Sequence, residues 1–290
     1  MKNKKVRLIL LLLLVGGAIL FFYFSSHSSS VSFLILGDWG SGTQDQLDTA
    51  KAMGNRCAPE ECDFVVSVGD NFYPSGVQST KDPFWKTRYK EVYQDLELPF
   101  YAAIGNHDRF GNSQAQIDYS KIDSSWRMPG DHYSVEFPEG GESPTLELFV
   151  ISAELFGGEV RDWLTREIDS SRAVWKMLVV HHPIISNGPH GDDEMRINDE
   201  LLPIICNKID LVLSGHDHLY AHLQETINEC RIDQLILGAG GQSVYEANSE
   251  DKRVLSTASL FSFGWIKATK KQLRFQAIQS DGTIYDTFEK

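Results

Sequence analysis

The chain has 290 residues, of which 42% are apolar and 11% aromatic, and its formal net charge at pH 7 is −13. This length and apolar content suffice for one sizeable hydrophobic core, and no internal repeat or low-complexity linker interrupts the sequence. The acidic balance, with no Lys/Arg-rich run outside the amino terminus, opposes a role in binding a nucleic-acid backbone.

The first 30 residues predict a membrane-targeting segment. Three lysines and an arginine lie within the first seven residues, and an uncharged apolar run (8–24) and a Ser-rich spacer follow them. The run is longer than the usual core of a cleaved signal peptide and approaches the length of a membrane span. The positive flank should stay in the cytosol, so residues 31–290 are expected to form one exported domain. An uncleaved signal anchor, which would tether the protein to the membrane, is slightly favoured over a cleaved signal peptide, which would release it. A buried core helix is disfavoured by the charged terminus.

Five apolar stretches predict buried strands, because each is rich in Val, Ile, Leu, Phe or Tyr and is bounded by Gly, Pro, Asn or Asp. They cover 31–36, 64–68, 100–104, 176–180 and 211–213. A short polar segment closes each stretch and supplies the candidate metal ligands Asp38, Asp70, Asn106, His181, His216 and His218. In sheets whose strands alternate with helices, sites form outside the carboxyl ends of the strands. We therefore expect these side chains to meet in one crevice.

Any one of these segments alone is more typical of a turn that needs a positive φ or an Asx hydrogen bond. Five together, all carrying oxygen or imidazole donors, predict a centre for two metal ions. Residues two apart on an extended chain point the same way, so His216 and His218 can reach one site while Asp217 points elsewhere. The neighbours His181 and His182 point to opposite faces. We assign His181 as a ligand and His182 to a structural role.

Helices are expected between the strands, at 44–56, 83–95, 159–171 and 193–207. Beyond Gly215, strand-like runs at 234–237, 260–268 and 272–279 have no helix between them. These later runs predict a second, antiparallel sheet. The expected fold class is therefore α/β, of the mixed, α+β-like kind.

The polar segments lie within longer runs that resemble those of metallophosphoesterases and, within that superfamily, of purple acid phosphatases of the small, tartrate-resistant animal type. The resemblance covers nearly all of 32–279. It is carried by the runs 37–40, 67–73, 76–78, 105–108, 114–117 and 119–122. It implies a four-layer α-β-β-α sandwich of two packed mixed sheets.

One departure within the superfamily identifies the purple type. General metallophosphoesterases open with Asp-x-His, whereas this chain has Asp38-Trp39-Gly40 and no histidine there. Purple acid phosphatases instead use a tyrosine three residues after the bridging aspartate, here Tyr73, and a phenolate suits ferric iron. The resemblance implies that Fe(III) is held by Asp38, Asp70, Tyr73 and His218. It implies that a second, divalent metal ion (iron, zinc or manganese) is held by Asp70, Asn106, His181 and His216.

The resemblance also implies the reaction. An acid phosphatase of this type hydrolyses phosphate monoesters, of a small molecule or a phosphoprotein, by attack of a metal-activated hydroxide on phosphorus. His107, beside Asn106, matches the family's histidine next to the metal ligands and is expected to donate a proton or a hydrogen bond. His190, on the loop after the His181 strand, is expected to do the same. Either could instead be a solvated loop histidine.

Two other functions stay open. A phosphodiesterase, nucleotidase or pyrophosphatase of the same superfamily would use two divalent ions, and it would show no visible colour. A non-catalytic, membrane-tethered binding protein would be marked by the loss of metal ligands, and none is missing here. The sequence determines neither the physiological substrate nor the oligomeric state.

The chain differs from the animal enzymes after Ile151. Those enzymes carry a longer loop that covers the site and is cut to raise activity, whereas here a short segment, 154–158, leads into a predicted helix. An open site without a clip loop is therefore expected. Arg109 supplies a cation that could attract the substrate.

The four cysteines are consistent with an exported chain. Cys57 and Cys62 are close enough in sequence to close a small disulfide loop, and Cys206 and Cys230 could form a second bond. Four cysteines allow three pairings, so the alternatives remain open. Zinc binding by these cysteines is disfavoured, because neither pair has Cys-x-x-Cys spacing.

Overall fold

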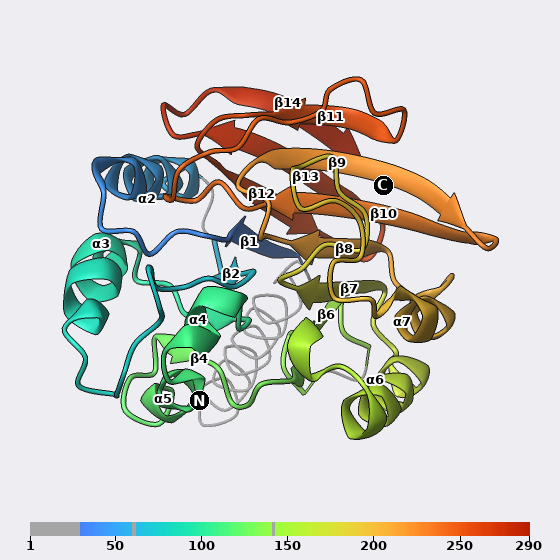
Figure 1. The fold of residues 1–290 in the computed structure, drawn as a ribbon, viewed down its shortest axis with the longest axis horizontal. Coiled ribbons are helices and arrows are strands. Elements are labelled where there is room, and N and C mark those ends of the chain that lie inside the picture. The colour runs from blue at the N-terminus through green and yellow to red at the C-terminus, as the bar shows by residue number, and fades with distance from the viewer. Residues whose placement is uncertain (1–29, 60–61, 141–142) are drawn as a thin grey trace, which may run out of the picture.

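Two seven-stranded sheets pack face to face, and helices cover the outer face of each (Figure 1). The computed structural model describes residues 30–59, 62–140 and 143–290. The predicted targeting segment, apart from Ser30, lies outside these ranges. Within them, no helix combines the length and the apolar character that a membrane crossing requires.

Both sheets are mixed, each with four parallel strands. The first sheet has the order β14 (Ile284–Glu289), β13 (Leu273–Gln279), β12 (Ser262–Ala268), β1 (Val31–Leu36), β2 (Phe64–Ser67), β3 (Phe100–Ala102) and β4 (Trp126–Arg127). The second has the order β11 (Val254–Ala258), β9 (Tyr220–Ile227), β10 (Cys230–Leu237), β8 (Leu211–Ser214), β7 (Trp175–Val180), β6 (Leu146–Ile151) and β5 (Tyr133–Phe137). Strands β1 to β4 run parallel in the first sheet, as do β6, β7, β8 and β10 in the second. The expected arrangement of two packed mixed sheets is confirmed.

The placement of the last strands corrects one prediction. Strands β12 and β13 were expected in a separate antiparallel sheet, but β12 pairs antiparallel with β1, with Ile35 opposite Gly264. Strands β12, β13 and β14 thus extend the first sheet beyond β1, whereas β9, β10 and β11 belong to the second. The local pattern of a strand carries no information about which free sheet edge it will join.

The helices agree with the predictions except at one start. Helices α2 (Gln44–Cys57) and α6 (Gly158–Ser170) match. The region expected at 83–95 is helical but irregular: it consists of the π-helix η1 (Trp85–Lys90), the α-helix α3 (Glu91–Tyr93) and the 3-10 helix η2 (Gln94–Leu96). Shorter helices are α4 (Asn106–Phe110), α5 (Ser113–Tyr119) and η3 (Ala153–Leu155).

Helix α7 (Asn198–Ile205) begins later than the predicted residue 193. Asp193 and Arg196 adopt left-handed φ values of 45° and 56°, which a right-handed helix excludes. The Asp193 carboxylate accepts the backbone N–H groups of Ile197 and Asn198, at 2.8 and 3.2 Å, at the start of the helix. The preceding segment, which contains Glu194, is therefore a turn.

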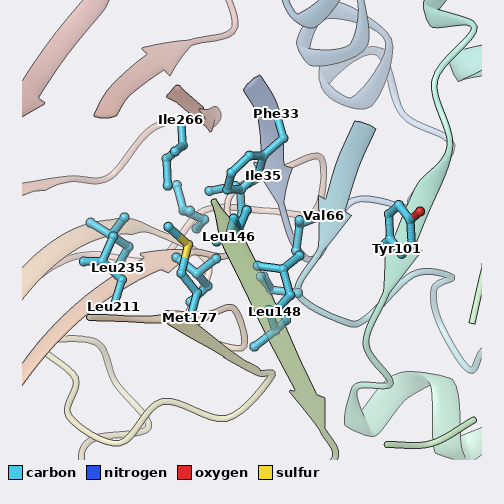
Figure 2. Close-up of a cluster of buried hydrophobic side chains, with 14 of the residues drawn as sticks. Phe33, Ile35, Val66, Tyr101, Leu146, Leu148, Met177, Leu211, Leu235 and Ile266 are labelled. Atoms are coloured by element: carbon cyan, nitrogen blue, oxygen red, sulfur yellow. The ribbon is translucent and has the colours of Figure 1, made fainter. Parts of the chain in front are cut away.

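The sheets share an apolar core, part of which Figure 2 shows. Along β1, Phe33 and Ile35 face the other sheet, whereas Leu34 and Leu36 face the helical layer. Helices α2 and α3 cover the first sheet, and α6 and α7 cover the second. Because the central strands are buried on both faces, they appear in the sequence as continuous apolar runs. The four-layer sandwich is confirmed.

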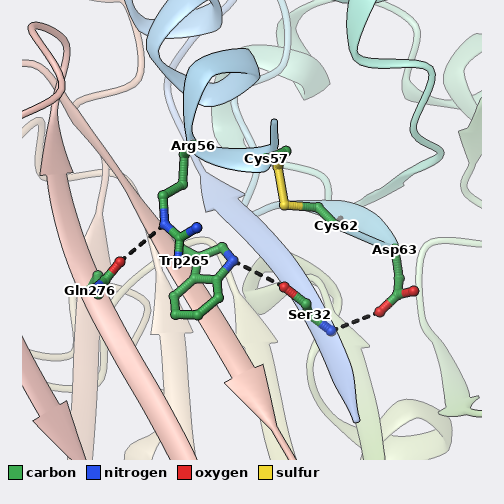
Figure 3. Close-up of a disulfide and its surroundings, with 7 residues drawn as sticks. All are labelled: Ser32, Arg56, Cys57, Cys62, Asp63, Trp265 and Gln276. Atoms are coloured by element: carbon green, nitrogen blue, oxygen red, sulfur yellow. Dashed lines mark hydrogen bonds between the residues drawn. A yellow bond between two sulfur atoms is a disulfide. The ribbon is translucent and has the colours of Figure 1, made fainter. Parts of the chain in front are cut away.

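The first predicted disulfide is present, between Cys57 at the end of α2 and Cys62 just before β2 (Figure 3). Beside it, the Arg56 guanidinium lies 3.6 Å from the centre of the Trp265 ring and donates a hydrogen bond of 3.0 Å to Gln276. These contacts join α2 to β12 and β13. The disulfide region therefore fastens the helical layer to the later strands of the first sheet.

The second pair, Cys206 and Cys230, consists of two free thiols. Burial, and then the neighbouring Cys206 thiol, raise the pKa of Cys230 to about 12, which suppresses the reactive thiolate. We expect unreduced, denatured protein to show two titratable thiols per chain, and prior reduction to raise the number to four. Absence of titratable thiol before reduction would mean that the second disulfide forms.

Candidate metal centre

The predicted ligands come together where the carboxyl ends of five parallel strands meet. Strands β1, β2 and β3 supply residues from the first sheet, and β7 and β8 supply them from the second. Six of the seven side chains are buried and one, Asn106, is half-buried. The seven are Asp38, Asp70, Tyr73, Asn106, His181, His216 and His218. The site therefore lies at the junction of the two sheets, outside the shared core.

Tight turns direct these side chains inward. Asp38, Asp70 and His216 have left-handed φ values of 56°, 53° and 70°. Non-glycine residues seldom adopt this conformation, and its strain persists where the surrounding structure enforces it, commonly at functional sites. Adjacent glycines leave room for the carboxylates, because a Cβ on Gly105 would lie 2.2 Å from Asp70 Oδ1 and one on Gly215 would lie 2.4 Å from Asp38 Oδ2.

Four candidate metal ligands, grouped around the phenol oxygen of Tyr73, form the first half of the site. Its oxygen lies 2.9 Å from Asp38 Oδ1 and 2.8 Å from Asp70 Oδ2. The same oxygen lies 3.1 Å from His218 Nε2. This is the set that the resemblance to purple acid phosphatases implies for ferric iron.

The second half is built around the side-chain oxygen of Asn106. This oxygen lies 3.0 Å from His181 Nε2 and 3.1 Å from His216 Nδ1. Asp70 Oδ1 lies 3.5 Å from the same His181 nitrogen. Asp70 therefore presents one oxygen to each half, which is one way in which a carboxylate can bridge two ions.

In each of the three histidines, one ring nitrogen (the outer nitrogen) contacts an oxygen outside the ligand set. The other (the inner nitrogen) faces the site. His181 Nδ1 lies 3.0 Å from the Val68 carbonyl oxygen, and His218 Nδ1 lies 2.7 Å from that of Ser243. His216 Nε2 lies 2.5 Å from Glu194 Oε2. A carbonyl or carboxylate oxygen only accepts, so each outer nitrogen can keep its proton there while the inner nitrogen presents its lone pair to a bound cation. Metal-binding histidines are held in this way.

The ligand oxygens and nitrogens of the two halves lie close together, and this arrangement attracts positive charge. Burial opposes the charged form of His181, yet the carboxylates of Asp70 and Asp38 raise its pKa to about 10. Burial and the same two carboxylates raise the pKa of Tyr73 well above its usual value. A tyrosinate at this position therefore needs a strongly positive ion beside it. The donor set fits two cations, one in each half.

The two predicted catalytic histidines flank the two halves. His107 Nδ1 lies 2.6 Å from the Pro74 carbonyl oxygen, and its ring lies 4.5 Å from that of Tyr73. His190 Nδ1 lies 2.9 Å from Asp217 Oδ1, and its ring lies 4.1 Å from that of His216. Each ring is thus oriented through Nδ1 at the edge of the site. Asp217 fixes His190 and contributes nothing to the ligand set, in agreement with the predicted direction of its side chain.

Sequence reasoning missed Glu194 and did not recognise the structural role of Asp108. Glu194 lies in the turn that was predicted as helix, and nothing in the local pattern distinguishes it. Asp108 is buried and accepts the backbone N–H groups of Asn71 and Gly105, each at 3.0 Å, so it joins two ligand-bearing loops. Burial, and then the Asp70 carboxylate, raise the pKa of Asp108 to about 7. Its position in the Gly-Asn-His-Asp motif is the signal that could have revealed it.

Arg109 contacts two neighbouring side chains. Its Nη2 donates a hydrogen bond of 2.8 Å to Ser152 Oγ, and its Nε lies 3.5 Å from Glu154 Oε2. Glu154 therefore balances part of the Arg109 charge, and the attraction of a phosphate ester by Arg109 stays a prediction.

Comparison with known proteins agrees with this geometry. The family model for calcineurin-like phosphoesterases matches residues 31–220. Purple acid phosphatase 17 of Arabidopsis thaliana is 35% identical over 89% of this chain and 82% of its own. Tartrate-resistant acid phosphatase type 5 of Sus scrofa is 26% identical over 87% of this chain and 84% of its own.

A solved structure shows the same fold. GAP50, the anchor in the inner membrane complex of Plasmodium, has a TM-score of 0.77 at 24% identity, over 89% of this chain and 88% of its own. The sequence matches extend over most of the chain, and the shared fold agrees with them. The chain belongs to the calcineurin-like phosphoesterases and, within them, to the purple acid phosphatases.

Proposed function

We propose that this protein is an acid phosphatase that hydrolyses phosphate monoesters at a centre of one ferric and one divalent metal ion. The observation that carries the proposal is the double donor set. Tyr73 completes the first half, and Asp70 gives one oxygen to each half. A phenolate among the donors favours a hard trivalent ion, whereas imidazole and amide donors accept divalent iron, zinc or manganese.

The charge of the ligands explains how an acidic protein could bind a phosphate ester. Two carboxylates and one tyrosinate carry three negative charges, against five positive charges on a ferric and a divalent ion. The surplus favours the binding of an anion, whether a small phosphate ester or a phosphoprotein. Such an ion pair, when bound, withdraws charge from a phosphate oxygen and supplies hydroxide as the nucleophile at acidic pH.

The surrounding residues orient the site and handle the proton. The backbone N–H of His107 donates to Asp70 Oδ1 at 2.8 Å, so the loop that carries His107 also fixes the bridging carboxylate. With Nδ1 of His107 and of His190 held by oxygen acceptors, the Nε2 of each ring is the nitrogen left to face a substrate. We assign to these two nitrogens the transfer of a proton or hydrogen bond to the departing alcohol or phenol.

A single preparation tests the assignment. Metal content, the visible spectrum and hydrolysis of a chromogenic phosphomonoester at acidic pH should be measured on residues 30–290. We expect iron, a visible tyrosinate-to-iron band and acid phosphatase activity. Two divalent ions without colour would assign the protein instead to the phosphodiesterase, nucleotidase or pyrophosphatase branch. Failure to bind metal after reconstitution would leave only a binding role.

The site should also be open without proteolytic activation. Strand β6 ends at Ile151, η3 follows at once, and α6 begins at Gly158, so no long loop is inserted there. We expect mild trypsin treatment to leave the hydrolysis rate within about twofold of its starting value. A tartrate-resistant phosphatase that carries the longer loop is the matched control. A large rise in the rate of this protein would contradict the prediction.

We also propose that residues 1–30 deliver the 31–290 catalytic domain to an exported, extracytoplasmic location. The Cys57–Cys62 disulfide supports this, because such bonds persist in oxidising compartments. Cell fractionation and amino-terminal sequencing of the mature protein test the proposal. Membrane-bound protein with an intact terminus would identify a signal anchor, and a terminus near residue 30 would identify a cleaved signal peptide. Intact protein in the cytosol would contradict export.

A further inference from the structure

We propose that the protein has a third divalent-cation site, formed by His182, Glu194 and the outer nitrogen of His216. Each residue offers one ligand atom, and the three atoms lie within 4.8 Å of one another. The rings of His182 and His216 are 4.2 Å apart. This group is separate from the seven predicted ligands except for His216, whose inner nitrogen faces Asn106. It gives His182 a role beyond the structural one expected from the sequence.

The buried imidazole of His182 is the first observation that points to a ligand. Its side chain is 5% exposed, and its Nδ1 has no hydrogen-bond partner among the described residues. That nitrogen lies 3.8 Å from Glu154 Oε1, which likewise has no hydrogen-bond partner within the described ranges. A carboxylate behind a histidine favours the proton on the near nitrogen and leaves a lone pair on the far one. Metal-binding histidines likewise have a carboxylate on the side away from the ion, but that carboxylate accepts a hydrogen bond, for which 3.8 Å is too long.

Glu154 is itself held in place. Its Oε2 accepts a hydrogen bond of 2.7 Å from Ser152 Oγ and lies 3.5 Å from Arg109 Nε. Ser152 Oγ in turn accepts a hydrogen bond of 2.8 Å from Arg109 Nη2. The carboxylate that backs His182 is therefore fixed by a cation and a hydroxyl, and it does not depend on a mobile surface side chain.

Glu194 opens the group to solvent. Its side chain is 45% exposed, whereas that of His216 is 8% exposed, so an ion can arrive from the Glu194 side. Two imidazole nitrogens and one carboxylate oxygen form a ligand set that suits zinc and leaves a position for water. In the absence of this third ion, His216 Nε2 donates its proton to Glu194. An ion at that nitrogen displaces the proton to solvent, and His216 then bridges the second metal position and the third.

Zinc binding to the protein that already carries its two resident ions tests the proposal. The loaded protein is dialysed against increasing Zn²⁺, and bound metal is counted by elemental analysis while the visible spectrum follows the resident pair. We expect one zinc ion per chain beyond the resident two. In Glu194→Gln and His182→Gln the affinity for this zinc should fall by more than the roughly 10–100-fold that the loss of a supporting residue causes.

A surface histidine provides the matched control. His132 lies 2.7 Å from Asp131 in a pair remote from the predicted ligands in the sequence, so His132→Gln should keep the third zinc. If His182→Gln does not fold, the test depends on Glu194→Gln, whose side chain is half exposed. A count that stops at two ions in saturating zinc would overturn the proposal, as would a third ion retained in both variants. Failure of the phosphatase assignment is a different result, namely a chain without resident iron, colour or hydrolysis.

Discussion

Asp70→Asn should abolish the binding of both resident ions together and lower kcat/KM for a phosphomonoester at least about 1,000-fold, or about 4 kcal/mol. Among the seven candidate ligands, Asp70 contributes to both halves of the site, with Oδ2 beside the Tyr73 phenol and Oδ1 beside His181. Burial raises the pKa of Asp70, but the His181 imidazole holds it well below its usual range. At the acidic pH of the assay the aspartate is therefore a carboxylate, whereas the amide carries no charge to share between two ions.

The asparagine variant should remain folded. Asp70 has a left-handed φ of 53°, and asparagine is one of the few residues that adopt this conformation readily. Asp118→Asn, on the exposed face of α5, is the control and should keep both ions and full activity. Elemental analysis measures the ions bound to each variant, and steady-state kinetics measure its kcat/KM for the phosphomonoester. An Asp70→Asn protein that retained two tightly bound ions would show that Asp70 does not bridge them.

Tyr73→Phe should remove the visible band completely and weaken the retention of ferric iron by more than about 10–100-fold, since a direct ligand is lost. The Tyr73 side chain is buried, and its oxygen lies within 3.1 Å of one ligand atom each on Asp38, Asp70 and His218. Because burial and the neighbouring carboxylates raise the pKa of this phenol, its ionised form exists only beside a strongly positive ion. The colour therefore reports iron at this position.

A second tyrosine beside the site supplies the control. The Tyr245 ring stacks on His218 with ring centres 4.2 Å apart, so it lies near the same donors. Tyr245→Phe should keep both the band and the iron, as measured by visible absorption and elemental analysis of freshly purified protein. If the band survived in Tyr73→Phe, the tyrosinate assignment and the ferric half of the proposed centre would both fail.

Much of the fold follows from local patterns. The continuous apolar run 31–36 predicts a strand buried on both faces, and β1 has those bounds. The Gly-containing polar segments after β1, β2 and β8 mark strand ends, because left-handed turns there, at Asp38, Asp70 and His216, favour Gly, Asp, Asn and His. Short strands such as β4 were missed, since two residues carry no periodicity. The expected sheet is wrong for β12 and β13 but right for β10, because the choice of a partner depends on which sheet edge is free.

Three features of the site can be read directly from the sequence: the order of the polar segments, the ends of the strands that bear them and the replacement of a histidine by Tyr73. These features depend on neighbouring residues or on a motif, which the sequence displays directly. Three contacts of the site could not be read from the sequence: Glu194 with His216, Glu154 with His182, and Arg109 with Glu154. Each of these contacts joins segments that become neighbours only when the strand ends and loops pack together. A lone charged residue has the same local pattern whether it faces solvent or a buried imidazole, so the outer partners of the site appear only in three dimensions.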